Sequence, residues 1–225
     1  MKTALITGAN KGIGREVARQ LASKGFRVFI GARNADAGRK TAEEIGAGFL
    51  HLDVADAASV TNAARELARH VEHLDVLVNN AGMIVDGDDK VLENSDAMFR
   101  ETLETNTLGP LRVTRAFLPL LEKSAAARVI NVSSSGGQLD GGADGRAPAY
   151  CISKTALNGV TSQLAATLPK FAVNSVCPGW VRTDMGGSNA TRSVAEGADT
   201  IVWLASEAPH EATAKFFKER KEIAW

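Results

Sequence analysis

Cysteine is scarce in this chain, since only Cys151 and Cys177 occur among its 225 residues. Two cysteines make neither the disulfide framework of a small secreted domain nor a cluster that could hold a metal. We therefore expect a protein of a reducing compartment, with no disulfide and no metal site.

The chain also lacks net charge and long apolar runs. Lys plus Arg and Asp plus Glu both number 26, so the formal charge is zero and nothing favours binding to a polyanion or a membrane surface. No run approaches the roughly 18 apolar residues of a membrane span, and no secretory leader is recognisable. We expect a cytoplasmic protein without nucleic-acid or membrane partners, folded as one domain over residues 1–225.

Glycine, in contrast, is concentrated near the start of the chain. Residues 7–14 read Thr-Gly-Ala-Asn-Lys-Gly-Ile-Gly, between an apolar run at 3–6 and a helical pattern at 15–22. Glycines between a strand and a helix allow a tight turn and bring backbone N–H groups close to a bound pyrophosphate. The spacing differs from the usual dinucleotide fingerprint, so a glycine-rich turn without a ligand remains an alternative.

Short apolar runs alternate with helical patterns along the rest of the chain. This alternation predicts a single Rossmann-type, doubly wound α/β domain with helices on both faces of a mostly parallel, six- or seven-stranded sheet. A long helix at 95–122 is expected to bend near Gly109 and Pro110. Residues 218–222 form a charged tail. The expected strands are residues 3–6, 26–30, 48–52, 74–78, 128–132, 171–177 and 214–217.

The end of the second expected strand indicates which dinucleotide would bind. An acidic residue there would bond the ribose of NADH, but this chain has Arg33, which would attract a ribose 2′-phosphate. Lys11 could add to this positive pocket, whereas Arg39 and Lys40 are as well explained as solvated helix charges. Asp53, at the end of the third strand, could bond the adenine amino group or contact the following helix.

Tyr150 and Lys154 lie four residues apart in a predicted helix, which places both side chains on one face. An ammonium group there would lower the pKa of the phenol and make it a usable general acid or base. On spacing alone, such a pair is far more often part of an ordinary helix surface. The segment at about 180–192, with paired glycines and an exposed Trp and Met, is a candidate substrate lid.

Together these features resemble the short-chain dehydrogenase/reductase family over essentially the whole chain. The resemblance rests on residues 7–14, 79–82 (Asn-Asn-Ala-Gly), 131–134 (Asn-Val-Ser-Ser), 150–154 (Tyr-Cys-Ile-Ser-Lys) and 178–179 (Pro-Gly), which occur in the family's order. The Asn-Lys pair in the glycine turn, residues 177–185 and the terminal Trp225 are most similar to the NADPH-dependent carbonyl reductases.

The resemblance implies a role for each matching residue. Tyr150 would protonate the substrate carbonyl, and Lys154 would bond the nicotinamide ribose and lower the Tyr150 pKa. Ser134 would hold the carbonyl oxygen, with Ser133 and Ser135 as rivals, and Asn106 would connect Lys154 to a relay water. The implied cofactor-binding residues are Gly8, Asn10, Lys11, Gly12, Ile13, Gly14, Arg33, Asp53, Asn80, Ala81, Gly82, Tyr150, Lys154, Pro178, Gly179, Val181 and Thr183, the last bonding the carboxamide.

The expected function is reversible hydride transfer between NADPH, preferred over NADH, and an aldehyde, ketone or quinone. A protein that binds NADP(H) as a sensor, without turnover, is the alternative, and a complete catalytic set argues against it. Only fifteen residues separate Ser134 from Tyr150, so no long insertion covers the Tyr150 helix, and we expect a homodimer or homotetramer. Ala214 stands where related reductases often have glycine, which leaves the end of the sheet open.

Overall fold

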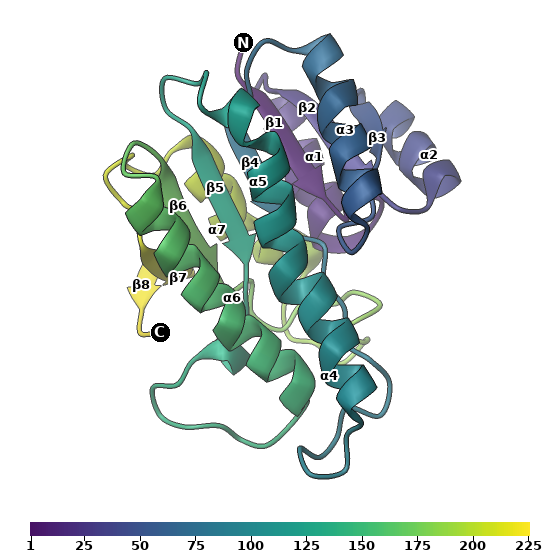
Figure 1. The fold of residues 1–225 in the computed structure, drawn as a ribbon, viewed down its shortest axis with the longest axis vertical. Coiled ribbons are helices and arrows are strands. Elements are labelled where there is room, and N and C mark those ends of the chain that lie inside the picture. The colour runs from purple at the N-terminus through teal and green to yellow at the C-terminus, as the bar shows by residue number, and fades with distance from the viewer.

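An eight-stranded sheet forms the centre of the structure, a computed structural model that describes residues 1–225 (Figure 1). The strands lie in the order β3-β2-β1-β4-β5-β6-β7-β8, and all pairs are parallel except β7 with β8. The strands are β1 (Thr3–Thr7), β2 (Arg27–Ala32), β3 (Gly48–His51), β4 (Val76–Asn79), β5 (Arg128–Val132), β6 (Ala172–Val176), β7 (Lys215–Lys218) and β8 (Lys221–Ile223).

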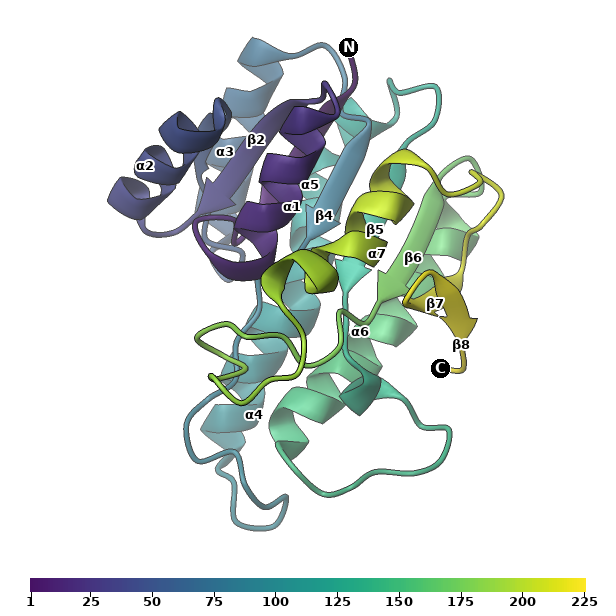
Figure 2. The same ribbon diagram turned by 180° about the vertical axis from the view of Figure 1, so that it is seen from behind.

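Helices cover both faces of this sheet, as predicted for a doubly wound fold. Helices α3, α5 and α6 lie on the face seen in Figure 1, and α1 and α7 lie on the opposite face, seen in Figure 2. None of the helices combines the length and apolar character needed to cross a membrane. The helices are α1 (Gly12–Ser23), α2 (Ala35–Ile45), α3 (Ala57–His70), α4 (Asp96–Leu103), the π-helix η1 (Glu104–Leu108), α5 (Gly109–Leu121), the 3₁₀ turn η2 (Ser135–Gly137), α6 (Pro148–Thr167) and α7 (Val194–Ser206).

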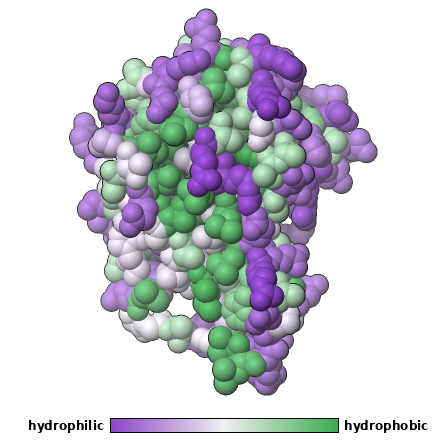
Figure 3. Space-filling view, viewed as in Figure 1, coloured by the Kyte–Doolittle hydropathy of each residue, from purple (hydrophilic) through white to green (hydrophobic).

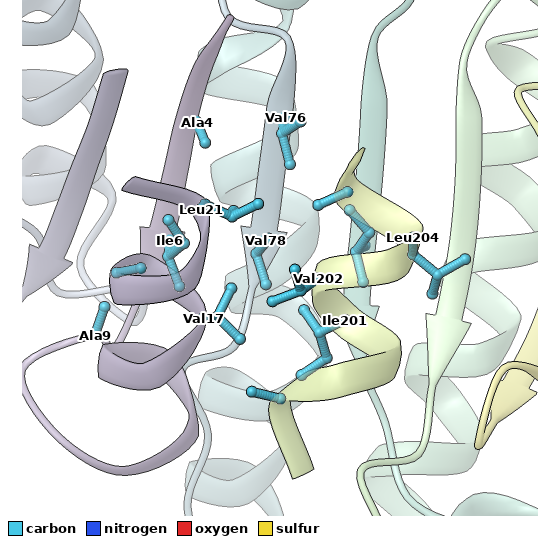
Figure 4. Close-up of a cluster of buried hydrophobic side chains, with 14 of the residues drawn as sticks. Ala4, Ile6, Ala9, Val17, Leu21, Val76, Val78, Ile201, Val202 and Leu204 are labelled. Carbon is cyan, nitrogen blue, oxygen red and sulfur yellow. The ribbon is translucent and has the colours of Figure 1, made fainter. Parts of the chain in front are cut away.

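The core has two layers, one on each face of the sheet. Every residue of β1 and β4 is buried, although their side chains alternate between the two faces. On one face, Val17 and Leu21 of α1 and Ile201 of α7 pack against β1 and β4 (Figure 4). On the other face, α3, α5 and α6 contribute a second apolar cluster that includes Phe117. Burial on both faces explains why the strands are continuous apolar runs in the sequence.

The prediction of six or seven strands is wrong by one at the C-terminus, where the charged tail forms β8. Glu219 and Arg220 both have positive φ, 51° and 59°, which suits a tight turn between antiparallel strands. The chain therefore reverses and pairs Phe216 with Ile223, and the Trp225 ring stacks on Phe216 at 5.7 Å between centroids. The sequence did not predict this strand because its residues are mostly charged, and an edge strand needs only one apolar face.

The predicted interruption of the long helix takes the form of the π-helix η1, which ends just before Gly109. Pro110 has no N–H to donate to the carbonyl of Asn106, its helical partner four residues earlier. Gly109 packs against Val54, and a Cβ on it would lie 3.0 Å from Val54 Cγ2. The wider turn places Asn106, fully buried, inside the molecule beside α6.

Ala214 immediately precedes β7 and adopts φ +55°, while its N–H donates to Val173 O at 2.9 Å. An L-residue in this region is strained by about 1–2 kcal/mol. We expect Ala214→Gly to raise the free energy of unfolding by about 0.5–1 kcal/mol, because relief of strain exceeds the added chain entropy. Urea unfolding checks this, with Ala212→Gly, where φ is not positive, as a control that lowers stability. A lower midpoint for Ala214→Gly would contradict the strain argument.

Candidate active site

A groove of about 890 Å³ runs along the carboxyl ends of the strands. It crosses the point between β1 and β4 where the direction of winding reverses, which is the usual ligand site of an open parallel sheet. Its lining comes from the glycine turn, the ends of β2 and β3, residues 80–84, residues 132–135, α6 and residues 178–186. Every predicted cofactor and catalytic residue contributes to this lining except Asn106.

The glycine turn has the close packing that its sequence predicts. Gly8 has φ +62°, and a Cβ added to it would lie 2.8 Å from the Cα of Ala81. A Cβ on Gly14 would lie 2.8 Å from Gly8 O. Helix α1 begins at Gly12 with no side-chain cap and no acidic residue in its first turn, so its first N–H groups are available to an anion. The turn therefore fits a dinucleotide pyrophosphate.

Asn80 supports the turn from the neighbouring strand. Its Nδ2 donates to Thr7 O at 2.9 Å and to Gly8 O at 3.2 Å. Thr7 Oγ1 in turn accepts the N–H groups of Asn80 and Ala81, both at 3.0 Å. Because Asn80 is occupied in this way, its side chain shapes the groove and leaves the backbone of Ala81 and Gly82 to face a ligand.

Arg33 and Asp53 line the end of the groove formed by β2 and β3. The exposed Arg33 side chain makes no ion pair, whereas its carbonyl oxygen is bonded to His51 Nε2 at 3.1 Å. Asp53 Oδ1 accepts the N–H of Ala55, and Asp56 is the residue that caps α3. A free guanidinium is thus present where a 2′-phosphate is predicted.

Lys11 has a partner that the sequence did not indicate. Its Nζ lies 2.6 Å from Asp184 Oδ2, and both side chains are largely exposed. The ion pair joins the glycine turn to the loop after β6, beside Gly12, where an added Cβ would lie 3.4 Å from Thr183 Cγ2. Because Lys11 is paired with Asp184, a phosphate in the groove would have to compete with that carboxylate for the Lys11 ammonium group. Arg39 lies outside the groove, against the Phe49 ring.

Tyr150, Lys154 and Ser134 meet at the other end of the groove, where α6 passes the end of β5. The Ser134 hydroxyl lies beside the Tyr150 phenol, and its Oγ accepts the N–H of Gly136 at 3.1 Å. Lys154, only 4% exposed, places Nζ 5.5 Å from the centroid of the Tyr150 ring and donates to Val132 O at 2.8 Å. Of the rival serines, Ser133 is buried and turned toward Lys154 O, and Ser135 donates its N–H to Cys177 Sγ.

The predicted lowering of the Tyr150 pKa is wrong for this arrangement. Burial raises the pKa of the phenol to about 12, and the neighbouring Ser134 hydroxyl opposes that rise only in part. Burial also lowers the pKa of Lys154 to about 8. Desolvation exceeds the attraction between the two groups because the ammonium donates to Val132 O rather than to the phenol oxygen. Tyr150 is therefore a protonated phenol at neutral pH.

Asn106 holds the backbone beside the site. Its Oδ1 accepts Met83 N–H and its Nδ2 donates to Met83 O, both at 2.8 Å, and Nδ2 also lies 3.0 Å from Ser153 Oγ. None of these bonds reaches Lys154, although a Cβ on Gly82 would lie 3.3 Å from Asn106 Oδ1 and 3.4 Å from Lys154 Nζ. The relay through a water remains a prediction.

A chain of buried polar side chains joins β4, β5, α6 and β6, and no motif of the sequence predicts these contacts. Asn79 of β4 donates to Asn131 of β5, which donates to Thr161 of α6, and Thr161 bonds Ser175 of β6, each at 2.8 Å. Such a network sets the register of α6 against three strands. Its signal in the sequence is an Asn within each of two otherwise apolar strands.

The segment after β6 closes the third side of the groove. Val181 is buried against α7, and its bridge partner is Arg192. Thr183 Oγ1 accepts Gly186 N–H at 3.1 Å, and Trp180 Nε1 donates to Gly186 O at 2.9 Å. These contacts fold residues 180–186 along the groove, and the opening of residues 180–192 as a lid remains a prediction.

Comparisons with known proteins agree with this fold. A family model described as short chain dehydrogenase matches residues 2–194. The (+)-neomenthol dehydrogenase of Arabidopsis thaliana is 34% identical, with 98% of this chain and 97% of that protein aligned. The NADPH-bound carbonyl reductase from chicken fatty liver superposes with a TM-score of 0.90 at 27% identity, covering 100% of this chain and 99% of that one. Carbonyl reductase Sniffer of D. melanogaster superposes with a TM-score of 0.91 at 29% sequence identity, covering 100% of both chains.

Proposed function

The chain belongs to the short chain dehydrogenase family, and from that premise we propose that it is an NADPH-dependent reductase of aldehydes, ketones or quinones, reversible with the alcohol. The observation that carries the proposal is that Ser134, Tyr150 and Lys154 meet at one end of a groove whose other end presents Arg33. The alternative of a sensor without turnover would need the groove but not these three side chains.

The residues of the groove divide between holding the cofactor and polarising the substrate. NADPH, when bound, supplies the hydride that is added to the carbonyl carbon. Tyr150 supplies the proton for the carbonyl oxygen, and its raised pKa keeps it protonated until that oxygen becomes basic. The Ser134 hydroxyl would orient the same oxygen, and Lys154, beside the Tyr150 ring, would bond the nicotinamide ribose.

The dinucleotide would lie along the groove. Its pyrophosphate fits the Gly8–Gly14 turn and the start of α1, and its 2′-phosphate fits the free guanidinium of Arg33. Thr183 and Val181 cover the nicotinamide side. The NADPH-bound state of the chicken liver carbonyl reductase, which has the same fold over the whole chain, supports this placement.

The substrate side of the groove is apolar and partly open. Ile84, Trp180 and Met185 line it with side chains 39–54% exposed, and no charged side chain lies among residues 80–84. An uncharged, largely apolar carbonyl compound would cover these side chains, whereas Arg182, the cation of the same segment, already donates to the carbonyl oxygens of Ala190 and Thr191. This favours hydrophobic ketones and quinones.

A direct assay tests the function. We expect NADPH absorbance to fall in the presence of apolar ketones, aldehydes or quinones, with weak turnover of 2-oxo acids. Tight NADPH binding with no turnover of any carbonyl would contradict the reductase and favour the sensor. Monitoring NADP⁺ reduction with the matching alcohols tests the reverse direction.

Arg33→Asp is expected to change cofactor choice. The ratio of kcat/KM for NADPH to that for NADH should fall roughly 100-fold, because the variant loses a charge-assisted phosphate contact and gains an acceptor for the unphosphorylated ribose. Steady-state kinetics with both cofactors measures this ratio. Arg39→Asp, on the adjacent helix outside the groove, is the matched control with an unchanged ratio. An unchanged ratio in Arg33→Asp would refute the phosphate contact.

A homodimer or homotetramer remains a prediction. Leu108 at the end of η1 and Ile152 on α6 are each 44% exposed. The face carrying α5 and α6 shows apolar residues among charged ones (Figure 3). Light scattering of the purified protein would determine the oligomeric state.

A further inference from the structure

Asp88 and Lys154 are the only charged residues that are buried in this protein, and both lie beside Tyr150. Asp88 belongs to the segment between β4 and α4, is 6% exposed and makes no ion pair. A buried carboxylate without a cation is costly unless it accepts several hydrogen bonds. The identity of its donors therefore shows what it stabilises.

Those donors are the first two free N–H groups of α6. Ala149 N–H donates to Asp88 Oδ1 and Tyr150 N–H donates to Asp88 Oδ2, both at 2.9 Å. The helix has no cap of its own, because the preceding residue Ala147 has φ +45° and no side-chain acceptor, and Pro148 lacks an N–H. Asp88 thus supplies, from 61 residues away in the sequence, the acceptor that normally precedes a helix.

Asp88 also anchors its own segment. Asn94 Nδ2 donates to Asp88 Oδ1 at 2.5 Å, and the start of the segment is held where Met83 bonds Asn106. Between these two anchors lies Ile84, on the substrate side of the groove. The carboxylate therefore connects the substrate side of the groove to the helix that carries Tyr150.

We propose that Asp88 is a positioning residue that holds the Tyr150 backbone at the uncapped start of α6 and so places the phenol against Ser134. The first turn of a helix frays when its N–H groups lack acceptors. The preceding loop gives little support, since Gly141, Gly142 and Gly145 all have positive φ and open surroundings. Displacing an acid by about 1 Å can reduce turnover about 100-fold. The catalytic part of this inference rests on the proposed function.

Amide exchange tests the cap without any need for activity. Tyr150 is the only tyrosine in the chain, so ¹⁵N-tyrosine labelling gives a single backbone amide signal. We expect its hydrogen exchange to be at least roughly tenfold faster in Asp88→Ala than in the wild type. Asp56→Ala, which removes the cap of α3 away from this site, should leave the signal unchanged. Equal exchange in wild type and Asp88→Ala would overturn the proposal.

Kinetics then separates positioning from simple stabilisation. Asp88→Ala should lower kcat about 10–100-fold with the Kd for NADPH changed less than about twofold. Asp88→Asn retains one acceptor oxygen, so its kcat should lie between that of Asp88→Ala and that of the wild type. This variant provides the measurement if Asp88→Ala does not fold. Asn94→Ala leaves both contacts of Asp88 with α6 intact, so its kcat should fall much less than that of Asp88→Ala.

Asp56→Ala is the control variant for the kinetic measurements. It should reduce the melting temperature with kcat unchanged. A wild-type kcat in both Asp88 variants, or a kcat loss in Asp56→Ala equal to that in Asp88→Ala, would overturn positioning. Absence of turnover in the wild type would instead contradict the proposed function, and the Tyr150 amide signal would still decide whether Asp88 caps α6.

Discussion

Tyr150→Phe is expected to lower kcat by roughly 10³-fold while NADPH binding stays within about twofold of the wild type. Phenylalanine keeps the ring that lies against Lys154 Nζ but removes the hydroxyl that would protonate the carbonyl oxygen. Loss of a general acid costs about 10²–10⁴-fold. Single-turnover absorbance of NADPH with excess enzyme isolates this step from product release.

The neighbouring Cys151→Ala provides the control for that experiment. Cys151 follows Tyr150 in the same helical turn, and its thiol donates to Arg146 O outside the groove lining. Its replacement should leave kcat nearly unchanged. Full turnover by Tyr150→Phe would contradict the mechanism. An equal loss of kcat in Tyr150→Phe and Cys151→Ala would indicate damage to α6 rather than a lost proton donor.

Gly14→Ala is expected to have the other large effect, on both stability and cofactor binding. The added Cβ would lie 2.5 Å from Asn80 Nδ2, 2.8 Å from Gly8 O and 2.9 Å from Ala9 Cα. Two of these are backbone atoms, so the turn itself must open. We expect a loss of about 1–3 kcal/mol in the free energy of unfolding, with NADPH affinity at least about 100-fold weaker because the pyrophosphate cradle is displaced. Urea unfolding and calorimetric titration measure the two effects.

Gly159→Ala is the matched control, because it makes the same chemical change inside α6 where the new Cβ meets no atom within 4 Å. It should raise the free energy of unfolding by about 0.5–1 kcal/mol and leave NADPH binding intact. If Gly14→Ala bound NADPH as tightly as Gly159→Ala, the close packing of the turn would have no part in cofactor binding.

The sequence was most informative where a function depends on neighbouring residues. The glycine turn lies between a strand and a helix within eight residues, so its shape follows from local sterics. The spacing of Tyr150 and Lys154 follows from helix geometry in the same way. The alternation of apolar strands and helices predicted the α/β fold, because strands buried on both faces must be apolar throughout.

The sequence was least informative where partners are distant or where solvation decides the outcome. The carboxylate of Asp184 beside Lys11, 173 residues away, has no local signal. The pKa of Tyr150 depends on how completely the fold removes water from the phenol, and spacing from Lys154 does not measure this. The strand β8 was missed because its charged residues lie at an edge, where one face stays in solvent.

The sequence by itself determined the α/β architecture, the glycine turn and the helical spacing of Tyr150 and Lys154, because each depends on backbone sterics and periodicity over a few residues. Only the tertiary structure decided that Ser134 lies beside the phenol while Ser133 turns toward Lys154 O, and that the protonated phenol lies beside a buried ammonium. Only the fold, likewise, brought Asp88 to the uncapped start of α6. These outcomes depend on burial and on contacts between distant segments, which local sequence patterns do not encode.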